Sequence, residues 1–126
     1  MNRLDAEQSV LGGIMLDSQA YWRVADILTA EEFSTAENRR LWETVAQLHR
    51  ESLPADPVTI GEKFPVLGAV ALRYANLTAS IANIRAWAEL VVSTSTQRRV
   101  NAAGQQIAKL NGSDALAEAQ ALLAGC

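Results

Sequence analysis

The feature that most constrains this fold is a continuous helical pattern over residues 81–110 of a 126-residue chain. A helix of about 30 residues is about 45 Å long, because each residue adds about 1.5 Å. A compact domain of 126 residues, in contrast, has a radius of gyration of only about 14 Å. One end of the helix is therefore expected to extend beyond a single core unless another subunit covers it.

The apolar side chains of this long helix form two stripes, displaced from each other by about a third of a turn. The first stripe consists of Ile84, Trp87, Ala88 and Val91, and the second consists of Val100, Ala103, Ile107 and Leu110. The polar residues 93–96 separate the two stripes. We expect the first half to close a globular core and the second half to pack into a hairpin or against another chain.

Composition limits the class of protein. Hydrophobic residues make up 49% of the chain and charged residues 20%, which is enough for a modest core. Abundant alanine and only three prolines favour an all-α fold. The 14 acidic residues outnumber the 11 basic ones, giving a formal charge of −3, which argues against sequence-independent nucleic-acid binding. A single cysteine, no signal peptide and no long apolar run indicate a cytoplasmic soluble protein without a membrane partner.

Capping residues and apolar spacing predict five shorter helices before the long one. The first begins after the N-cap Asp5 and the second after Asp17 or Ser18. The third begins at Ser34, which forms a capping-box pattern with Glu37, and it ends near residue 52. The side chains expected to face the core from these helices are Ala6, Val10, Leu11, Ile14, Met15, Trp22, Ala25, Leu28, Asn38, Leu41, Trp42, Val45 and Leu48.

Prolines mark the limits of the next two helices. Asp56 and Pro57 predict the N-cap and first residue of a brief helix through Phe64, which Pro65 is expected to end. The fifth helix is expected over residues 69–79. It carries Leu72, Ala75 and Leu77, with Tyr74 beside them.

Two consecutive glycines, Gly12 and Gly13, lie inside the first predicted helix. Each costs a helix up to about 1 kcal/mol relative to alanine. We expect another helix to approach closely at this point, which would explain why no side chain is present.

A second helix is expected to fold back on the long one. Asn111 and Gly112 predict the C-cap of the long helix, and Ser113 with Asp114 predict the start of a last helix. The inward-facing residues of that last helix are Leu116, Ala119 and Leu123. The sequence therefore predicts a globular helical subdomain over residues 1–80 and an antiparallel helical hairpin over residues 81–126, with the second helix cut short.

The segment DAEQSVLGGIMLD at residues 5–17 resembles the opening motif of the N-terminal domain of DnaB-type replicative DNA helicases. Weaker resemblances follow in the same order along nearly the whole chain. They comprise Phe33, Arg39, Leu41 and Trp42, then Pro54, Asp56 and Thr59, and finally Asn83, Ile84, Trp87, Ala88 and Val91. The chain departs from the family in having Asn38 where histidine is common, a short region from residue 64 to 74, and a last helix that breaks off at Cys126.

The resemblance implies a function in assembly and docking during DNA replication. Family hairpins pair subunits, so the implied self-association is a dimer, or a trimer of dimers within a hexamer. The family collar recruits primase and a helicase loader, and DNA would be reached only indirectly through the parent protein. Tyr74 lies where the family has a tyrosine linked to primase recognition, although a core position is the alternative reading. A RecA-like motor domain that uses ATP and Mg²⁺ is implied beyond residue 126.

The residues themselves offer no catalytic or cofactor site. The sequence lacks the G-x-x-x-x-G-K-[ST] phosphate loop, so we expect this chain alone neither to bind nor to hydrolyse ATP. His49, the only histidine, is expected on the solvated surface, and with one terminal cysteine it makes no metal site. Glu31 and Glu32 are interpreted as part of a solvated turn rather than as an acid/base pair.

Two arginine pairs allow two interpretations. Arg98 with Arg99, and Arg39 with Arg40, could bind the carboxylates of a partner through their forked guanidinium groups. The alternative, which we favour, is a solvated face with local ion pairs worth less than about 1 kcal/mol each.

Self-association is the most specific expectation. We predict a subunit interface formed by Val100, Ala103, Ile107, Leu110, Leu116 and Leu123, because one short hairpin cannot cover all of them. The competing function is a free-standing phage or plasmid protein that uses this domain to regulate a host helicase or primase. A helical DNA-binding regulator is disfavoured by the acidic charge and the lack of a basic recognition helix.

Overall fold

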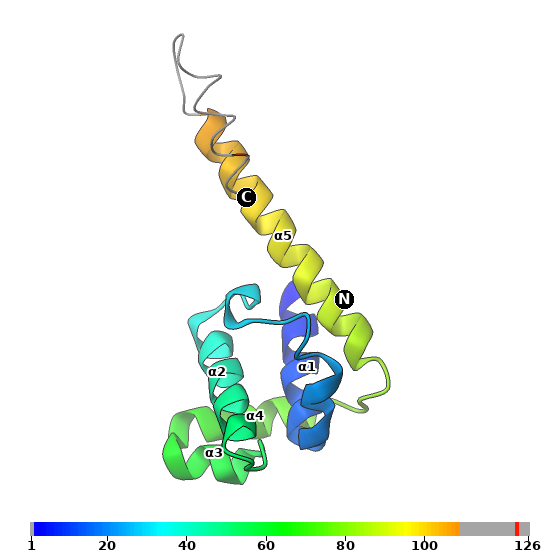
Figure 1. Cartoon of the computed structure of the whole chain (residues 1–126), viewed down its shortest axis with the longest axis vertical. Helices are drawn as coiled ribbons and strands as arrows, with labels where there is room; N and C mark the ends of the chain where they lie inside the picture. Colours follow the sequence, from blue (N-terminus) through cyan, green and yellow to red (C-terminus); the bar gives the residue numbers. More distant parts are fainter. Residues whose placement is uncertain (1, 109–122, 124–126) are drawn as a thin grey trace. The chain divides into compact units, whose positions relative to one another are not determined.

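The computed structural model describes residues 2–108 and Leu123, and all the regular structure in these residues is helical, which confirms the all-α prediction. Figure 1 shows the elements in chain order. They are α1 (Arg3–Leu16), the 3₁₀ turns η1 (Ser18–Arg23) and η2 (Ala30–Glu32), α2 (Ala36–Arg50), α3 (Pro57–Lys63), α4 (Pro65–Leu77) and α5 (Ile84–Ala108). None of the helices in these described residues is long and apolar enough to cross a membrane.

The chain forms two compact units, Met1–Val92 and Ser93–Cys126, and the division falls inside α5. The sequence placed the boundary between residues 80 and 81. The first turns of α5 belong to the first unit because Ile84, Ala88 and Val91 are fully buried in its core. This agrees with the expectation that the first stripe of the long helix closes a globular core.

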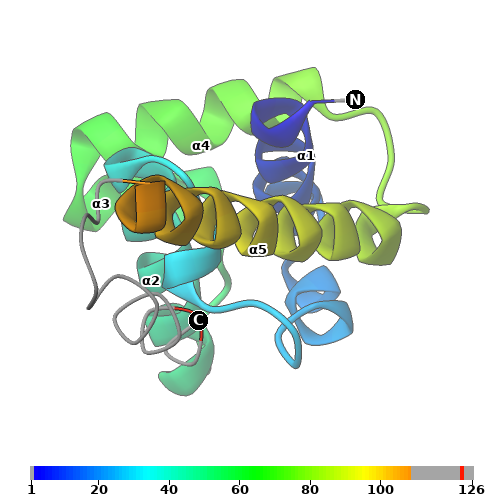
Figure 2. The same cartoon turned by 90° about the horizontal axis from the view of Figure 1, so that it is seen from above.

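The core of the first unit is built mainly on α1, which packs against α4, while α4 also packs against α3 (Figure 2). α2 contributes the predicted stripe at helical spacing. That stripe consists of Asn38, Leu41, Trp42, Val45 and Leu48, all of which are buried. This confirms the prediction for the helix. The stripe was predictable because the buried residues recur every three or four positions, which places them on one face of a helix with 3.6 residues per turn.

Close approach between helices explains the glycines, as the sequence predicted. A Cβ on Gly12 would lie 2.1 Å from Thr78 Oγ1 and 2.4 Å from the Tyr74 carbonyl oxygen. The end of α4 therefore crosses α1 where the latter has no side chain. A second crossing joins α3 to α4, where a Cβ on Gly68 would lie 2.4 Å from the Cα of Gly61.

Two predicted N-caps were wrong by one to three residues. Asn2, not Asp5, caps α1, and its side-chain oxygen accepts a hydrogen bond from the Asp5 backbone N–H at 2.9 Å. Thr35, not Ser34, caps α2 and accepts from the Asn38 N–H at 3.1 Å. Ser34 is unavailable as a cap because it donates hydrogen bonds to a carboxylate of α1.

The segment after α1 was predicted as an α-helix, but it is a 3₁₀ turn capped by Asp17. A 3₁₀ turn has three residues per turn, which changes the residues that face inward. Ala20 and Val24 are buried, whereas Trp22, predicted to face the core, is 61% exposed. Leu28 is buried as predicted.

α3 ends just before Pro65, as predicted, but Pro65 also starts α4, four residues earlier than the predicted start at residue 69. Proline is favoured at the first helical position because its missing N–H has no intrahelical partner there. The stripe expected for this helix was wrong at Leu72 and Leu77, which are 53% and 60% exposed. The face that packs inward consists of Leu67, Gly68, Val70, Ala71, Tyr74 and Ala75.

The long helix α5 begins at Ile84, three residues later than predicted. Residues 80–83 form a turn in which Ser80 Oγ accepts a hydrogen bond from the Ala82 N–H at 3.0 Å. The predicted C-cap at Asn111 and Gly112 and most of the predicted second hairpin helix lie outside the described residues.

Candidate functional site

The predicted subunit interface lies on the distal part of α5. Val100 is 47% exposed and Ile107 is half-buried, so both offer apolar surface to a neighbour. Ala103 is buried and offers little. Leu123 is described and exposed, whereas Leu110 and Leu116 lie outside the described residues.

Tyr74, the predicted partner-binding residue on α4, is mostly buried. Its hydroxyl donates a hydrogen bond to Asn38 Oδ1 at 2.7 Å. Burial raises the pKa of the Tyr74 hydroxyl, and the negative charge of Glu37 adds to the effect. The Arg73 guanidinium carbon lies 5.6 Å from the centre of the ring.

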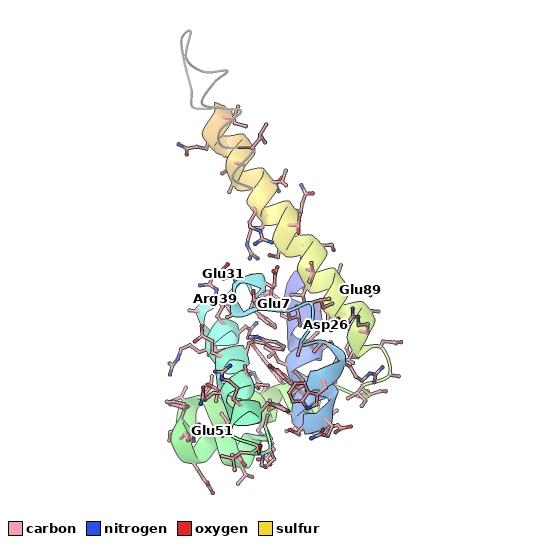
Figure 3. All side chains as sticks on the ribbon, viewed as in Figure 1. Glu7, Asp26, Glu31, Arg39, Glu51 and Glu89 are labelled. Atoms are coloured by element: carbon pink, nitrogen blue, oxygen red, sulfur yellow. The ribbon has the colours of Figure 1, made fainter. Side chains whose placement is uncertain are left out.

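The hydrogen bond from Tyr74 is one end of a buried polar network that was not predicted from the sequence. Glu7 on α1 is fully buried and lies between α1 and α2 (Figure 3). Its carboxylate accepts three hydrogen bonds, from Ser34 N–H at 2.9 Å, Ser34 Oγ at 2.6 Å and Asn38 Nδ2 at 3.1 Å. Asn38 then accepts from Tyr74, so the network joins α1, the segment before α2, α2 and α4.

This network stabilises the fold rather than carrying out chemistry. The Glu7 carboxylate has no surface exposure, and donors from the protein itself already satisfy it. A buried carboxylate held by several donors fixes the helices relative to one another. The sequence did contain a signal for it, because Glu7 lies at helical spacing from Leu11 and Ile14 on the buried stripe of α1.

His49 was predicted to be solvated, and this prediction was wrong. Its ring stacks on Tyr21 with centroids 4.1 Å apart. Nδ1 lies 2.9 Å from the Val45 carbonyl oxygen and Nε2 lies 2.9 Å from the Ser18 carbonyl oxygen. His49 therefore joins the end of α2 to η1, which no local pattern in the sequence indicates.

The two arginine pairs have different environments. Arg39 Nε donates to the Phe33 carbonyl at 3.0 Å, so this residue holds the segment that enters α2. Arg40 instead lies over the ring of Phe64, with its guanidinium carbon 5.6 Å from the ring centre. Arg98 is half-buried and Arg99 is exposed on α5. No group of three or more potential metal-binding side chains occurs among residues 2–108.

The chain was compared with known families and structures. The family model for the DnaB-like helicase N terminal domain matches residues 1–109. Replicative DNA helicase DnaB of Synechocystis sp. is 30% identical over 115 residues, which cover 85% of this chain and 13% of that protein. The Haemophilus influenzae protein of the same name is 30% identical over 113 residues, covering 83% of this chain and 24% of that protein. This chain therefore spans less than a quarter of the length of these relatives.

Two solved structures have the same fold. The crystal structure of the N-terminal domain of DnaB helicase from Mycobacterium tuberculosis has a TM-score of 0.87 at 24% identity. The alignment covers 98% of this chain and 96% of that one. A structure of a DnaB-like replicative helicase and its interactions with primase has a TM-score of 0.78 at 23% identity, covering 97% of this chain and 31% of that one.

Proposed function

Because the chain belongs to the DnaB-like helicase N terminal domain family, we propose that it is the assembly and partner-docking domain of a hexameric replicative DNA helicase. In this role it pairs with other copies of itself and recruits primase and a helicase loader. It does not itself catalyse a reaction or bind a cofactor. ATP and Mg²⁺ are needed only by a motor domain beyond residue 126, and DNA is reached through that parent protein.

The observation that carries the proposal is the family match over residues 1–109, which spans both the closed first unit and the distal part of α5. The exposed Val100 and half-buried Ile107 on α5 support self-association, because apolar side chains at helical spacing form packing surfaces. A DnaB-like replicative helicase with the same fold interacts with primase, and this supports the proposed recruitment of primase.

Sedimentation of the 126-residue chain over a range of concentrations tests assembly. We expect a concentration-dependent dimer, and Ile107→Asp should convert it to a monomer while the helix content stays nearly unchanged. The matched control is Asn101→Asp, which adds the same charge to α5 and keeps the acceptor for the hydrogen bond from Gln97. A wild-type chain that remains monomeric at several hundred micromolar would contradict the assembly role.

Calorimetric titration with the primase of the same organism tests recruitment. We expect binding in the micromolar range, about −8 kcal/mol, and no binding of ATP under the same conditions. Sequencing the gene downstream of codon 126 then decides between the two forms of the proposal. A phosphate loop in the same reading frame indicates a helicase, whereas a stop codon favours a free-standing regulator.

A further inference from the structure

We propose that the groove between α2 and the junction of α3 and α4 binds an acidic amphipathic helix of a partner protein, with Arg40 as the anchor for its carboxylate. Hereafter this site is the Arg40 groove. It is lined by Ala36, Glu37, Arg40, Lys63, Phe64, Pro65, Val66 and Leu67, and its volume is about 460 Å³. The inference rests on the proposed docking function for its biological context, and it identifies a surface that differs from the predicted interface on α5.

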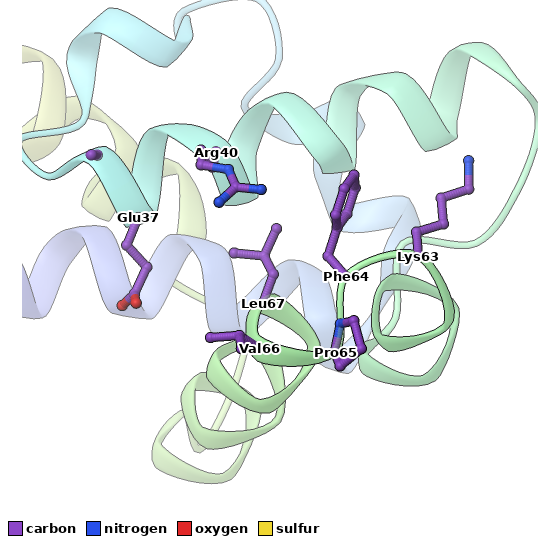
Figure 4. A pocket seen from close by; sticks show the side chains of 8 residues that line it. Glu37, Arg40, Lys63, Phe64, Pro65, Val66 and Leu67 are labelled. Carbon is purple, nitrogen blue, oxygen red and sulfur yellow. The ribbon is translucent and has the colours of Figure 1, made fainter.

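The floor and one wall of the groove are apolar (Figure 4). Leu67 is buried at its base, while Phe64 is 42% exposed and Val66 is 79% exposed. Phe64 is both the C-cap residue of α3 and the N-cap residue of α4, so it lies at the turn that joins the two helices. Large exposed apolar side chains gathered around a cavity are typical of protein-binding sites.

The other wall is positively charged. The Arg40 guanidinium faces the groove from α2 and lies over Phe64, and Lys63 lies beside that ring at the end of α3 (Figure 4). Lys63 makes an exposed ion pair of 3.4 Å with Glu51. Within the described chain, no carboxylate oxygen lies within 4.0 Å of an Arg40 nitrogen. The charge of Arg40, whose guanidinium stacks on Phe64, thus has no carboxylate partner in the described chain, and a carboxylate from outside could bind it.

The far end of the groove has the opposite charge, which orients the occupant. Glu37 lies there and makes a distant ion pair of 3.9 Å with Arg73. An acidic side chain of the partner is thus favoured near Arg40 and disfavoured near Glu37. This polarity also argues against nucleic acid, whose phosphates would meet Glu37 in a chain with a net charge of −3.

The charged and the apolar side chains of the groove lie next to each other, as a helical partner would need. The Arg40 guanidinium carbon and the centre of the Phe64 ring are 5.6 Å apart. Side chains three or four residues apart on a helix project from the same face, so a helix can contact both neighbouring groups at once. One leucine of the partner can therefore pack on Phe64 and Val66 while an aspartate or glutamate one turn away binds Arg40, which is a helix-in-groove arrangement.

The test is an NMR titration of the ¹⁵N-labelled chain with two synthetic amphipathic peptides of about 14 residues. One carries leucine and glutamate four residues apart, and the other has glutamine in place of that glutamate. We expect amide shifts confined to residues 36–40 and 63–67 and a dissociation constant of about 0.1–1 mM for the glutamate peptide. The glutamine peptide should bind about three- to tenfold more weakly, because it lacks the charged hydrogen bond.

Variants distinguish the contribution of the charged wall to peptide binding from that of the apolar wall. Arg40→Gln should abolish the preference for the glutamate peptide, and Arg50→Gln, which removes a charge from the same helix outside the groove, should keep it. Val66→Asp should abolish binding of both peptides. Val58→Asp is its matched control, because Val58 is 73% exposed and also follows the first proline of its helix.

Three outcomes would overturn the inference: shifts elsewhere on the chain, no shifts at millimolar peptide, or a preference for glutamate that persists in Arg40→Gln. The titration involves neither primase nor self-association. Its failure would therefore leave the proposed function intact, and failure of the primase or sedimentation experiments would leave the groove intact.

Discussion

The two compact units differ in how completely they bury their own apolar side chains. In Met1–Val92, buried hydrophobic residues come from α1, α2, α3, α4 and the start of α5. In the described part of Ser93–Cys126, Ala103 is the one buried hydrophobic residue, and Val100 is nearly half exposed. The difference suggests that the first unit supplies the stability of the chain, while the second offers apolar surface for association.

This contrast also separates two kinds of experiment. The three tryptophans, Trp22, Trp42 and Trp87, all lie in the first unit, so their fluorescence reports its unfolding. Helix content measured by circular dichroism also includes the distal part of α5. Paired substitutions, one in each unit, can therefore test whether the unit that buries more apolar side chains also contributes more to the free energy of unfolding.

The largest effect is expected from truncating the core. Leu41→Ala removes a fully buried side chain of α2 and should lower the free energy of unfolding by about 2–5 kcal/mol. Val100→Ala in the second unit should change it by less than about 0.5 kcal/mol. Urea denaturation followed by tryptophan fluorescence measures both. If the two variants lose similar amounts of stability, the division of roles between the units is wrong.

Alanine substitutions at two glycines, one in each unit, should change the stability in opposite directions. Gly12→Ala should cost about 3 kcal/mol, because its Cβ would meet the backbone carbonyl of Tyr74 at 2.4 Å. In the described chain, an added Cβ on Gly104 meets no atom within 4 Å apart from the nearby backbone of its own helix, so Gly104→Ala should favour the helix by up to about 1 kcal/mol.

Thermal unfolding followed at 222 nm should show this opposition directly. Gly12→Ala should lower the midpoint, and Gly104→Ala should raise or preserve the helix signal. A stable Gly12→Ala protein would mean that α1 and α4 can separate without cost.

The buried network should have an intermediate effect. Glu7→Gln keeps the side-chain shape but replaces one acceptor oxygen with a donor facing the Ser34 and Asn38 donors. We expect a loss of about 1–2 kcal/mol. The comparison in the second unit is Gln97→Ala, which removes an exposed hydrogen bond to Asn101 and should cost less than about 0.5 kcal/mol. Equal losses would show that burial does not strengthen the Glu7 contacts.

Periodicity and capping were sufficient to predict most of the first unit. The buried stripe of α2, the close approach at Gly12 and the N-cap Asp56 with Pro57 were all confirmed. The resemblance of residues 5–17 to the helicase family was confirmed as well. The stripe and the N-cap were predictable because neighbours within one or two helical turns decide them. The close approach at Gly12 was predictable because a glycine inside a helix costs stability unless another element needs the space.

The errors arose where contacts distant in sequence decide the structure. Trp22 was placed in the core because its segment was assumed to have 3.6 residues per turn, whereas it adopts a 3₁₀ turn. Ser34 was assigned as a cap, but it binds Glu7, 27 residues away. His49 was assigned to solvent, but its partner at Ser18 is 31 residues away. No spacing rule within a single helix contains that information.

The candidate sites were less predictable than the fold. The interface at Val100 and Ile107 stays a prediction, which rests on exposed apolar residues at helical spacing. The Arg40 groove could not be predicted, because it forms only when Phe64, expected at the end of a helix, is placed against α2 by the turn between two helices. Such a surface depends on the fold as a whole.

The smallest change in stability is expected at an exposed ion pair of the first unit. Because neither side chain is buried, this pair should contribute no more than an exposed contact of the second unit. Arg85 donates a hydrogen bond to Asp26 Oδ1 at 2.6 Å, and both side chains are largely exposed. This hydrogen bond holds the pKa of the Asp26 carboxyl below its ordinary value of 3.8. The folded state therefore favours the ionised carboxylate more than the unfolded state does.

The sign of the pH dependence follows from this depressed pKa. Asp26 contributes its stability fully above the unfolded pKa of 3.8, and the contribution is lost as the pH falls through the lower folded pKa. Asp26→Asn should thus lower the urea midpoint slightly at pH 7 and pH 5, and this difference should shrink below pH 3. Added salt should reduce it at every pH, since exposed pairs are screened. Arg85→Gln, combined with Asp26→Asn in a double-mutant cycle, isolates the pair. A difference that stays constant at pH 2.5 would show that Asp26 acts through packing and not through its charge.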